Sequence, residues 1–377
     1  MLILHTSDWH LGRSFKSTSL LGDQKAFINE LIEVVKGRRV DLVVIAGDIF
    51  DRGLPPAEAV VIWNDALARI IETGAQVVAI AGNHDQGERI EMKPALTNPA
   101  VVVRGTREAS LATMEFDDGP LTVVTVPFLD PFMARDLSQG EGAATHQSVI
   151  EGALAVVADE VAKSDRSLVV AHTFVTGGQE SESERSLLQV GGSDQVGAQV
   201  FDGYSYAALG HLHRPQEVNG PTVAYSGTPL PYSFSENHAK SMRLVTMSVT
   251  GEVTVETVPI KAGRPVVTIK GSFEELLKGD EYTEYESHFV RAHLTDPTTQ
   301  PGARDKLRER FAHILELSYL FFDDGLTTIL DSEDFENKPD VVVRTFWEDV
   351  TGEPASHPEE ELLDTAIRAG FNDGGSA

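Results

Sequence analysis

Short apolar runs alternate with amphipathic segments along about the first 130 residues of the chain. The segment Asp23–Lys36 repeats apolar residues, Phe27 and Leu31 among them, at helical spacing, which predicts a helix with one buried face. The strands expected are Leu2–Thr6, Val40–Ala46, Gln76–Ala81 and Leu121–Val126, and a second helix is expected from Pro55-Pro56 to about Thr73. Strands and helices that alternate in this way predict a parallel sheet covered by helices.

Beyond these residues the pattern continues with one helix and then changes to short strands. The elements expected are a helix at Ala143–Ala162, strands at Ser167–Ala171, Tyr206–Leu209 and Thr222–Ser226, and a hairpin of Met242–Val249 and Glu252–Pro259. Thr176–Gln199 is rich in Gly, Ser, Glu and Gln, which is typical of a loop, and we expect it to lie over the site. Together these elements predict a two-sheet α/β sandwich that ends near Lys261.

The remaining sequence divides into a small unit and a tail. Ala262-Gly263-Arg264-Pro265 has the composition of a linker. The elements expected after it are strands at Val266–Lys270 and Ser287–His293, helices at Phe273–Leu277 and Ala303–Leu317, and tail helices at Val341–Val350 and Pro358–Ala369. The sequence therefore predicts a main domain over 1–262, a small α+β domain over 263–337 and a helical tail over 338–377.

The composition is that of an ordinary globular protein, and it restricts the chemistry. The chain has 377 residues, of which 41% are hydrophobic and 24% charged, enough for two or three domains. It has no cysteine, so any metal must be held by histidine, carboxylate or amide groups. No apolar run approaches the roughly 18 residues of a membrane span, and a strand that begins at Leu2 leaves no room for a signal peptide. A cytoplasmic protein is expected.

The formal net charge of −27 argues against non-specific affinity for nucleic acid, which requires Lys and Arg to displace counterions. Roughly half of this excess lies beyond residue 262. It can reflect solubility or salt tolerance, or it can mean that a polyanionic substrate is held mainly by metals and a partner. The charge weakens a DNA hypothesis without removing it.

Side chains with affinity for metals stand at the ends of five of the expected strands. They are two aspartates, one asparagine and four histidines: Asp8, His10, Asp48, Asn83, His172, His211 and His213. Because strand ends in an open α/β sheet share one rim, ligands far apart in sequence can converge there. This set is about what two divalent metals with one shared carboxylate require, so a bimetal hydrolase is the first hypothesis.

Two of these clusters are informative by themselves. Gly47 allows a tight turn after its strand, and Asp48 can then bridge two cations through its two oxygens. His211 and His213 are two residues apart, which places them on the same side of an extended segment.

The order Asp-x-His, Gly-Asp-x-x-Asp, Gly-Asn-His-Asp, a lone His and Gly-His-x-His resembles the calcineurin-like metallophosphoesterase superfamily. More narrowly, three stretches resemble its SbcD family: ILHTSDWHLG at 3–12, GDIFD at 47–51 and SGTPL at 226–230. The resemblance runs from residue 1 to about 260. It implies the nuclease subunit of a bacterial SbcC–SbcD complex, an exonuclease on double-stranded DNA ends and an endonuclease on hairpin or single-stranded DNA that serves repair and recombination.

The resemblance also implies roles for individual residues. One metal would be held by Asp8, His10, Asp48 and His213, and the other by Asp48, Asn83, His172 and His211. In the same family His84 contacts the scissile phosphate and stabilises or protonates the leaving oxygen. By resemblance to the phosphatase branch, Asp51 would accept a hydrogen bond from His84 and orient it.

Cofactor and partners follow from the same resemblance. It implies Mn²⁺ as the metal, and DNA and the SbcC ATPase as partners, in a heterotetramer built on a homodimer of this chain. The unit at 263–337 would cap the DNA, and the tail at 338–377 would bind SbcC. A nucleoid-associated location is expected, with no membrane contact.

Two other functions stay open at this stage. A metallophosphoesterase acting on small phosphodiesters or phosphoproteins is the nearest rival, because Asp51-Arg52-Gly53 is similar to protein phosphatases. A non-catalytic scaffold that only regulates SbcC is the other, although the complete ligand set argues against it.

Several further residues have a structural interpretation beside a functional one. His5 lies inside the first strand, so we expect a packed core histidine. Arg13, Lys16 and Arg52 lie near the expected rim, either as solvated charges or as phosphate contacts. The apolar tail helices can pack on the small unit, but we favour a partner groove.

Overall fold

The computed structural model describes residues 1–92, 98–106, 109–138, 143–184, 195–320, 344, 347 and 355–372. Contacts between residues divide the chain into two compact units, Met1–Val266 and Val267–Ala377. The predicted boundaries after 262 and 337 stay predictions. None of the described helices is long and apolar enough to cross a membrane.

The first sheet of the larger unit has six strands in the order β16-β15-β1-β4-β5-β6. Their bounds are Val253–Pro259, Ser241–Met247, Leu2–Thr6, Leu42–Ile45, Gln76–Ile80 and Val101–Arg104. The last four are parallel, whereas β15 and β16 form an antiparallel hairpin that pairs with β1. The predicted parallel order and the predicted hairpin are both confirmed.

The second sheet has the strand order β13-β14-β12-β9-β8-β7. Its strands are Gln216–Glu217, Val223–Tyr225, Tyr206–Gly210, Ser167–His172, Gly119–Val126 and Ser110–Phe116. β8, β9, β12 and β14 run parallel, and the outer strands β7 and β13 are antiparallel to their neighbours.

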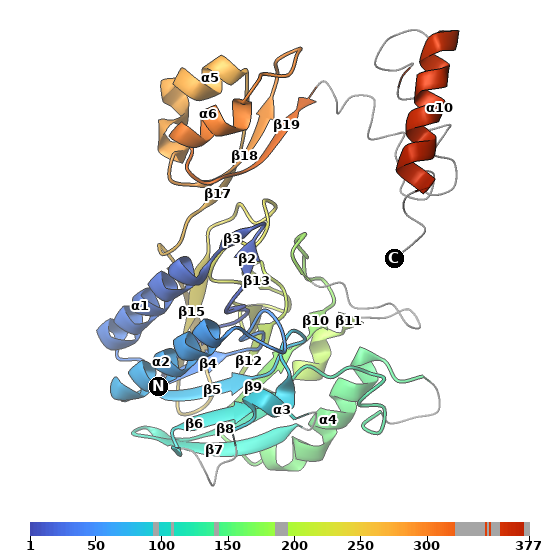
Figure 1. The fold of residues 1–377 in the computed structure, drawn as a ribbon. Helices are drawn as coiled ribbons and strands as arrows, with labels where there is room; N and C mark the ends of the chain where they lie inside the picture. Colours follow the sequence, from blue (N-terminus) through green and yellow to red (C-terminus); the bar gives the residue numbers. More distant parts are fainter. Residues whose placement is uncertain are drawn as a thin grey trace. The chain divides into compact units, whose positions relative to one another are not determined.

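The two sheets pack face to face with helices outside them. The space between the sheets is filled by aliphatic side chains such as Val44 and Val170, both fully buried. The outer helices are α1 (Leu21–Arg38) and α2 (Ala57–Glu72) on the first sheet, and α4 (His146–Val161) with the 3₁₀ helix η2 (Ala198–Phe201) on the second. Figure 1 shows α1 and α2 beside β4 and β5, and α4 beside the second sheet. The core is therefore the predicted two-sheet α/β sandwich.

His5 fastens the two sheets to each other. It lies on β1, is fully buried, and hydrogen-bonds through its two ring nitrogens to the hydroxyl of Tyr206 (3.0 Å) and the carbonyl of Leu209 (3.1 Å), both on β12. Burial, and next the charge of Arg243, lowers the pKa of His5 to about 3. The interpretation of His5 as a core histidine is confirmed.

The smaller unit contains a three-stranded sheet with its own core. Its strands are β17 (Val266–Gly271), β18 (Phe289–Leu294) and β19 (Ile314–Tyr319), and its helices are α5 (Phe273–Lys278), the 3₁₀ helix η3 (Asp280–Tyr285), α6 (Ala303–Arg310) and α10 (His357–Asn372). Leu276 of α5 and Leu307 of α6 are fully buried against Val290 of β18. A small α+β unit with a C-terminal helix is confirmed.

Some expected elements differ from the structure. The predicted helix Ala303–Leu317 is wrong in its second half, because α6 ends at Arg310 and Ile314–Tyr319 pairs in parallel with β18. The pattern also missed β6, β7 and the two-residue strands, among them β2 (Ser14–Phe15), β3 (Thr18–Ser19), β10 (Phe174–Val175) and β11 (Gln195–Val196). The segment expected as the loop Thr176–Gln199 contains β11, and its residues 185–194 lie outside the described part, as does most of the expected helix Val341–Val350.

Candidate metal centre

The predicted ligands stand at the carboxyl ends of β1, β4, β5, β9 and β12, where the two sheets share an edge. The loops after β1 and β4 hold each other in place through their main chains. The amide of Asp8 donates to the carbonyl of Gly47 (3.0 Å), and the amide of His10 donates to the carbonyl of Asp48 (2.9 Å). This pairing fixes the side chains of both loops on the same edge.

One group of these side chains gathers around His10. Its Nε2 lies 3.3 Å from Nε2 of His213 and 3.6 Å from Oδ2 of Asp48. Ligand atoms of Asp8, His10 and His213 all lie within 4.8 Å of one another. These separations are similar to those between neighbouring ligand atoms about 2.1 Å from one ion.

A second group gathers around Asn83. Its Oδ1 lies 3.0 Å from Nε2 of His172 and 3.2 Å from Nδ1 of His211. Nε2 of His172 lies 3.6 Å from Oδ2 of Asp48, so the same carboxylate oxygen faces both groups. The structure thus brings all seven predicted ligand residues into one cluster.

The chemistry of this donor set fits divalent cations. Asp8 and Asp48 are buried together, and burial, followed by the charge of Asp48, raises the pKa of Asp8 well above its usual value. Burial, and then the neighbouring histidines, hold the pKa of His10 and of His211 well below the usual value. Among the described residues, Nδ1 of His10 and Nε2 of His211 are buried without a hydrogen-bond partner. Neutral imidazoles and crowded carboxylates suit a mixed nitrogen and oxygen shell.

Backbone strain is concentrated at the same residues. Asp8, His10, Asp48 and His211 have φ values of 53°, 43°, 47° and 110°, and only two other described non-glycine residues have a positive φ. Such conformations are costly and cluster at functional sites. Gly47 has a φ of 92°, and a Cβ atom there would lie 2.2 Å from Nδ1 of His172. The tight turn predicted at Gly47 is therefore also a close approach to the site.

His84 lies beside the cluster, with its ring centroid 4.6 Å from that of His10. Its Nδ1 donates to the main-chain carbonyl of Asp51 (2.9 Å). The residue expected to orient His84 does contact it, but through its carbonyl and not through its carboxylate. The carboxylate of Asp51 pairs with Arg13 (3.2 Å) and lies 3.8 Å from Nδ1 of His10. It is drawn away because Arg13 is the nearest full positive charge.

Asp85 holds two of the ligand loops together, a role that the sequence did not indicate. Its carboxylate accepts hydrogen bonds from the amides of Ile49 (3.0 Å), Phe50 (2.9 Å) and Gly82 (2.9 Å). Burial and the nearby charge of Asp48 raise the pKa of Asp85 to about 7. Its position next to the Asn83-His84 pair was the only signal available in the sequence.

Arg13 is part of the site and not a solvated surface charge. Besides Asp51, its guanidinium contacts the carbonyl of Ser183 (3.4 Å) and lies 4.8 Å above the ring of Tyr232. That ring lies 5.2 Å from the ring of His10. Arg13 and Tyr232 thus form one wall beside the candidate ligands. Tyr232 stands in no metal motif, so sequence reasoning passed over it.

Glu236 is a buried carboxylate behind His213 that sequence reasoning also missed. Burial by itself would raise its pKa, but the ammonium of Lys240 and the hydrogen bond to His213 hold that pKa well below its usual value. The spacing of Glu236 and Lys240, four residues apart, was a possible signal for an ion pair.

Comparisons with known proteins agree with this geometry. The calcineurin-like phosphoesterase family model matches residues 1–215, and a model described as the type 5 capsule protein repressor C-terminal domain matches 262–351. The SbcD protein of the SbcCD nuclease from Staphylococcus epidermidis is 27% identical over 377 residues, 96% of this chain and 97% of that protein.

Similar solved structures have low sequence identity. A Thermus thermophilus protein is 12% identical with a TM-score of 0.40, covering 68% of this chain and 98% of its own. The calcineurin-like phosphoesterase YfkN of Bacillus subtilis is 14% identical with a TM-score of 0.40, covering 70% of this chain and 92% of its own.

Proposed function

The chain belongs to the calcineurin-like phosphoesterase family, and we propose that it is the nuclease subunit of an SbcC–SbcD complex, hydrolysing DNA phosphodiesters. The observation that carries this proposal is the position of Asp48. Its Oδ2 lies 3.6 Å from Nε2 of His10 on one side and 3.6 Å from Nε2 of His172 on the other. One carboxylate oxygen placed between two groups of donors is what a pair of bridged cations requires.

The donor groups give a specific assignment. Asp8, His10, Asp48 and His213 would hold one divalent ion, and Asp48, Asn83, His172 and His211 would hold the other, with Mn²⁺ as the proposed metal. A pair of such ions, when bound, supplies Lewis acidity for the phosphate and hydroxide near neutral pH. Oδ1 of Asp48 accepts a hydrogen bond from the amide of His84 (2.8 Å), so the arrangement favours a bridge through Oδ2 alone. This differs from the expected bridge through both oxygens.

We assign His84 to the scissile phosphate and the leaving oxygen. The carbonyl of Asp51 accepts the proton of Nδ1 whether the ring is neutral or charged, because a carbonyl is only an acceptor. Nε2 is therefore the nitrogen that meets the substrate, and it can donate a proton once the ring is an imidazolium. Asp51 acts here through its main chain, while its carboxylate holds Arg13.

Substrate and partner follow from the relative and from the charge. We propose exonuclease activity on double-stranded ends and endonuclease activity on hairpin or single-stranded DNA. A chain of net charge −27 has little long-range attraction for DNA, so an SbcC ATPase would supply much of the DNA affinity. This agrees with a heterotetramer built on a homodimer, working in the cytoplasm at the nucleoid.

The C-terminal helix is the proposed contact with SbcC. α10 carries Leu362, whose surface is 70% exposed, on a helix that is otherwise rich in acidic residues. An apolar side chain so exposed on a helix suits a groove on another protein. The expected result is that Leu362→Asp weakens SbcC binding, while Glu361→Gln on the same helix does not.

One experiment tests the activity directly. The full chain is incubated with Mn²⁺, with and without SbcC and ATP, on linear duplex DNA, hairpin DNA and a chromogenic phosphodiester. Asp48→Asn, prepared in the same way, controls for contaminating nucleases. We expect the wild-type protein to degrade DNA and the variant to leave it intact.

The other outcomes separate the alternatives. Cleavage of the small ester alone would replace the nuclease with a small-molecule phosphodiesterase. No turnover of any substrate would leave a scaffold that regulates SbcC.

A further inference from the structure

The two ring nitrogens of His213 face different surroundings. Nε2 lies 3.3 Å from Nε2 of His10, inside the candidate metal cluster. Nδ1 faces away from the cluster, 2.6 Å from Oγ of Ser183 and 3.4 Å from Oε1 of Glu236. A neutral imidazole carries one proton, and only the nitrogen without it can bind a cation. The chemistry of the cluster therefore depends on which nitrogen of His213 holds the proton.

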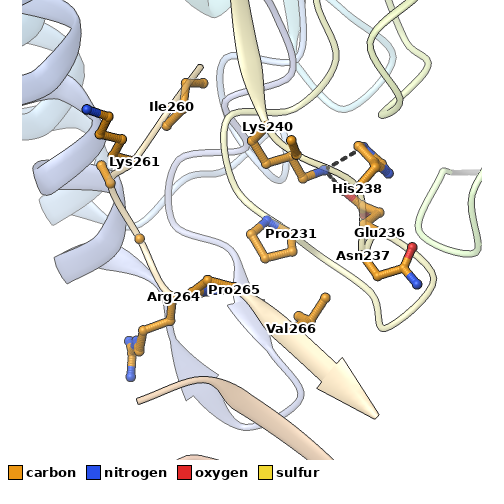
Figure 2. Close-up of a pocket in the computed structure, with 13 residues that line it drawn as sticks. Pro231, Glu236, Asn237, His238, Lys240, Ile260, Lys261, Arg264, Pro265 and Val266 are labelled. Carbon is orange, nitrogen blue, oxygen red and sulfur yellow. Dashed lines mark hydrogen bonds and ion pairs between the residues drawn. The ribbon is translucent and has the colours of Figure 1, made fainter. Parts of the chain in front are cut away.

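Glu236 is surrounded by donors. Its side chain is fully buried, and Oε1 accepts hydrogen bonds from the amide of Tyr232 (3.2 Å) and from the hydroxyl of Ser183. Oε2 accepts from the hydroxyl of Thr228 (2.9 Å) and from the ammonium of Lys240. Figure 2 shows Lys240 at the edge of a cavity of about 210 Å³, with its ammonium directed to Glu236 and His238. A carboxylate paired with an ammonium can only accept, so each of its neighbours must donate.

The proton positions then follow along the chain of contacts. The hydroxyl of Ser183 has a single proton, and Glu236 takes it. Toward His213 the hydroxyl has only a lone pair left, so it must accept the proton of Nδ1. We propose that Glu236 is a positioning residue which, through Ser183, holds the proton of His213 on Nδ1 and keeps Nε2 open for the metal. This inference rests on the proposed role of His213 as a ligand.

Replacing Glu236 by glutamine should reverse this chain. The ammonium of Lys240 repels an amide NH₂ and attracts its oxygen, so Glu236→Gln would direct the NH₂ toward Ser183. The hydroxyl would then accept from the amide and donate to Nδ1 of His213. The imidazole proton would move to Nε2, where it blocks the cation. Changes in groups that orient metal ligands reduce metal affinity roughly 10- to 100-fold.

The test reads the proton directly. The full chain with ¹⁵N-labelled histidine is compared with Glu236→Gln by long-range ¹H–¹⁵N correlation in the absence of metal, with the His213 ring assigned from a His213→Gln sample. We expect the wild-type ring to carry its proton on Nδ1 and the variant ring on Nε2. Titration calorimetry with MnCl₂ should show a roughly 10- to 100-fold weaker affinity in the variant.

Glu184→Gln is the matched control. Glu184 is also a carboxylate beside His213, but it accepts from the main-chain amide (2.8 Å) and not from the ring. A merely structural disturbance near His213 would affect both variants. We expect Glu184→Gln to keep the Nδ1 proton and the wild-type Mn²⁺ affinity.

Ser183→Ala removes the relay while it leaves the Glu236–Lys240 pair intact, so it decides the matter even if Glu236→Gln folds poorly. It should lower the population with the proton on Nδ1 and weaken Mn²⁺ binding by less than Glu236→Gln does. A wild-type ring protonated on Nε2, or wild-type spectra and affinity in both variants, would overturn the inference. Failure of the wild-type chain to bind Mn²⁺ would instead contradict the proposed metal centre, while the metal-free spectra still report on the relay.

Discussion

Oδ2 of Asp48 lies 3.6 Å from Nε2 of His172, although the two residues follow strands in different sheets. The same oxygen lies as far from His10. Asp48 is therefore the point at which the two halves of the sandwich meet chemically, and its substitution should affect both candidate ions at once.

Asp48→Asn should abolish Mn²⁺ binding and, unusually for a buried substitution, stabilise the metal-free protein. The neutral amide can still accept from His84, and it no longer repels the buried carboxylate of Asp8. We expect the free energy of unfolding without metal to rise by about 1–2 kcal/mol. Urea unfolding in the presence of a chelator measures this. A lower stability than wild type would show that the two carboxylates do not oppose each other.

Gly47→Ala should damage the site far more than Gly74→Ala. Both glycines have nearly the same backbone, with φ of 92° and 91°, but a Cβ at Gly47 meets His172 whereas one at Gly74 meets nothing within 4 Å. The shared conformational cost is about 1–2 kcal/mol, and the clash should bring Gly47→Ala to about 3–5 kcal/mol. Chemical unfolding and Mn²⁺ titration of both variants test this. Equal losses would mean that His172 can move aside freely.

His84→Ser should separate turnover from metal binding. His84 belongs to neither proposed ligand set, so Mn²⁺ affinity should stay near the wild-type value. Hydrolysis of the chromogenic phosphodiester should fall by about 10²–10⁴-fold, the usual contribution of a general acid. Asp48→Asn is the contrast, because it should lose both properties. Wild-type turnover by His84→Ser would remove the role assigned to this residue.

His5 should make the fold sensitive to acid. Its pKa is about 3 in the folded protein against 6.5 as its ordinary value, so below pH 6.5 the unfolded chain takes up a proton that the folded chain refuses. This residue should lower the free energy of unfolding by up to about 1.4 kcal/mol for each pH unit between 6.5 and 3.

Urea unfolding at several pH values, on wild type and on His5→Gln, gives the slope. We expect the variant to be less stable at pH 7 but less sensitive to acid, by about one proton. His357→Gln, at an exposed histidine on α10, is the control. An unchanged slope in His5→Gln would show that His5 does not resist protonation in the fold.

The sequence was sufficient to predict the strand ends and the ligand residues, because strand–helix alternation places such ends on one edge. It was not sufficient for contacts that depend on the exact path of the chain. The carboxylate of Asp51 turns toward Arg13, and Ser183 and Glu236 meet His213 only because a loop and a distant turn converge behind it. The strand Ile314–Tyr319 continues the apolar spacing of the helix before it, so periodicity alone extended that helix too far.

The most direct test of the account is anomalous diffraction from crystals of the chain grown with Mn²⁺. We expect two peaks about 3.5–4 Å apart, on either side of Oδ2 of Asp48, one near His10 and His213 and the other near Asn83 and His172. A single peak, or peaks that do not share Asp48, would contradict the bridged pair of ions on which the proposed hydrolysis depends.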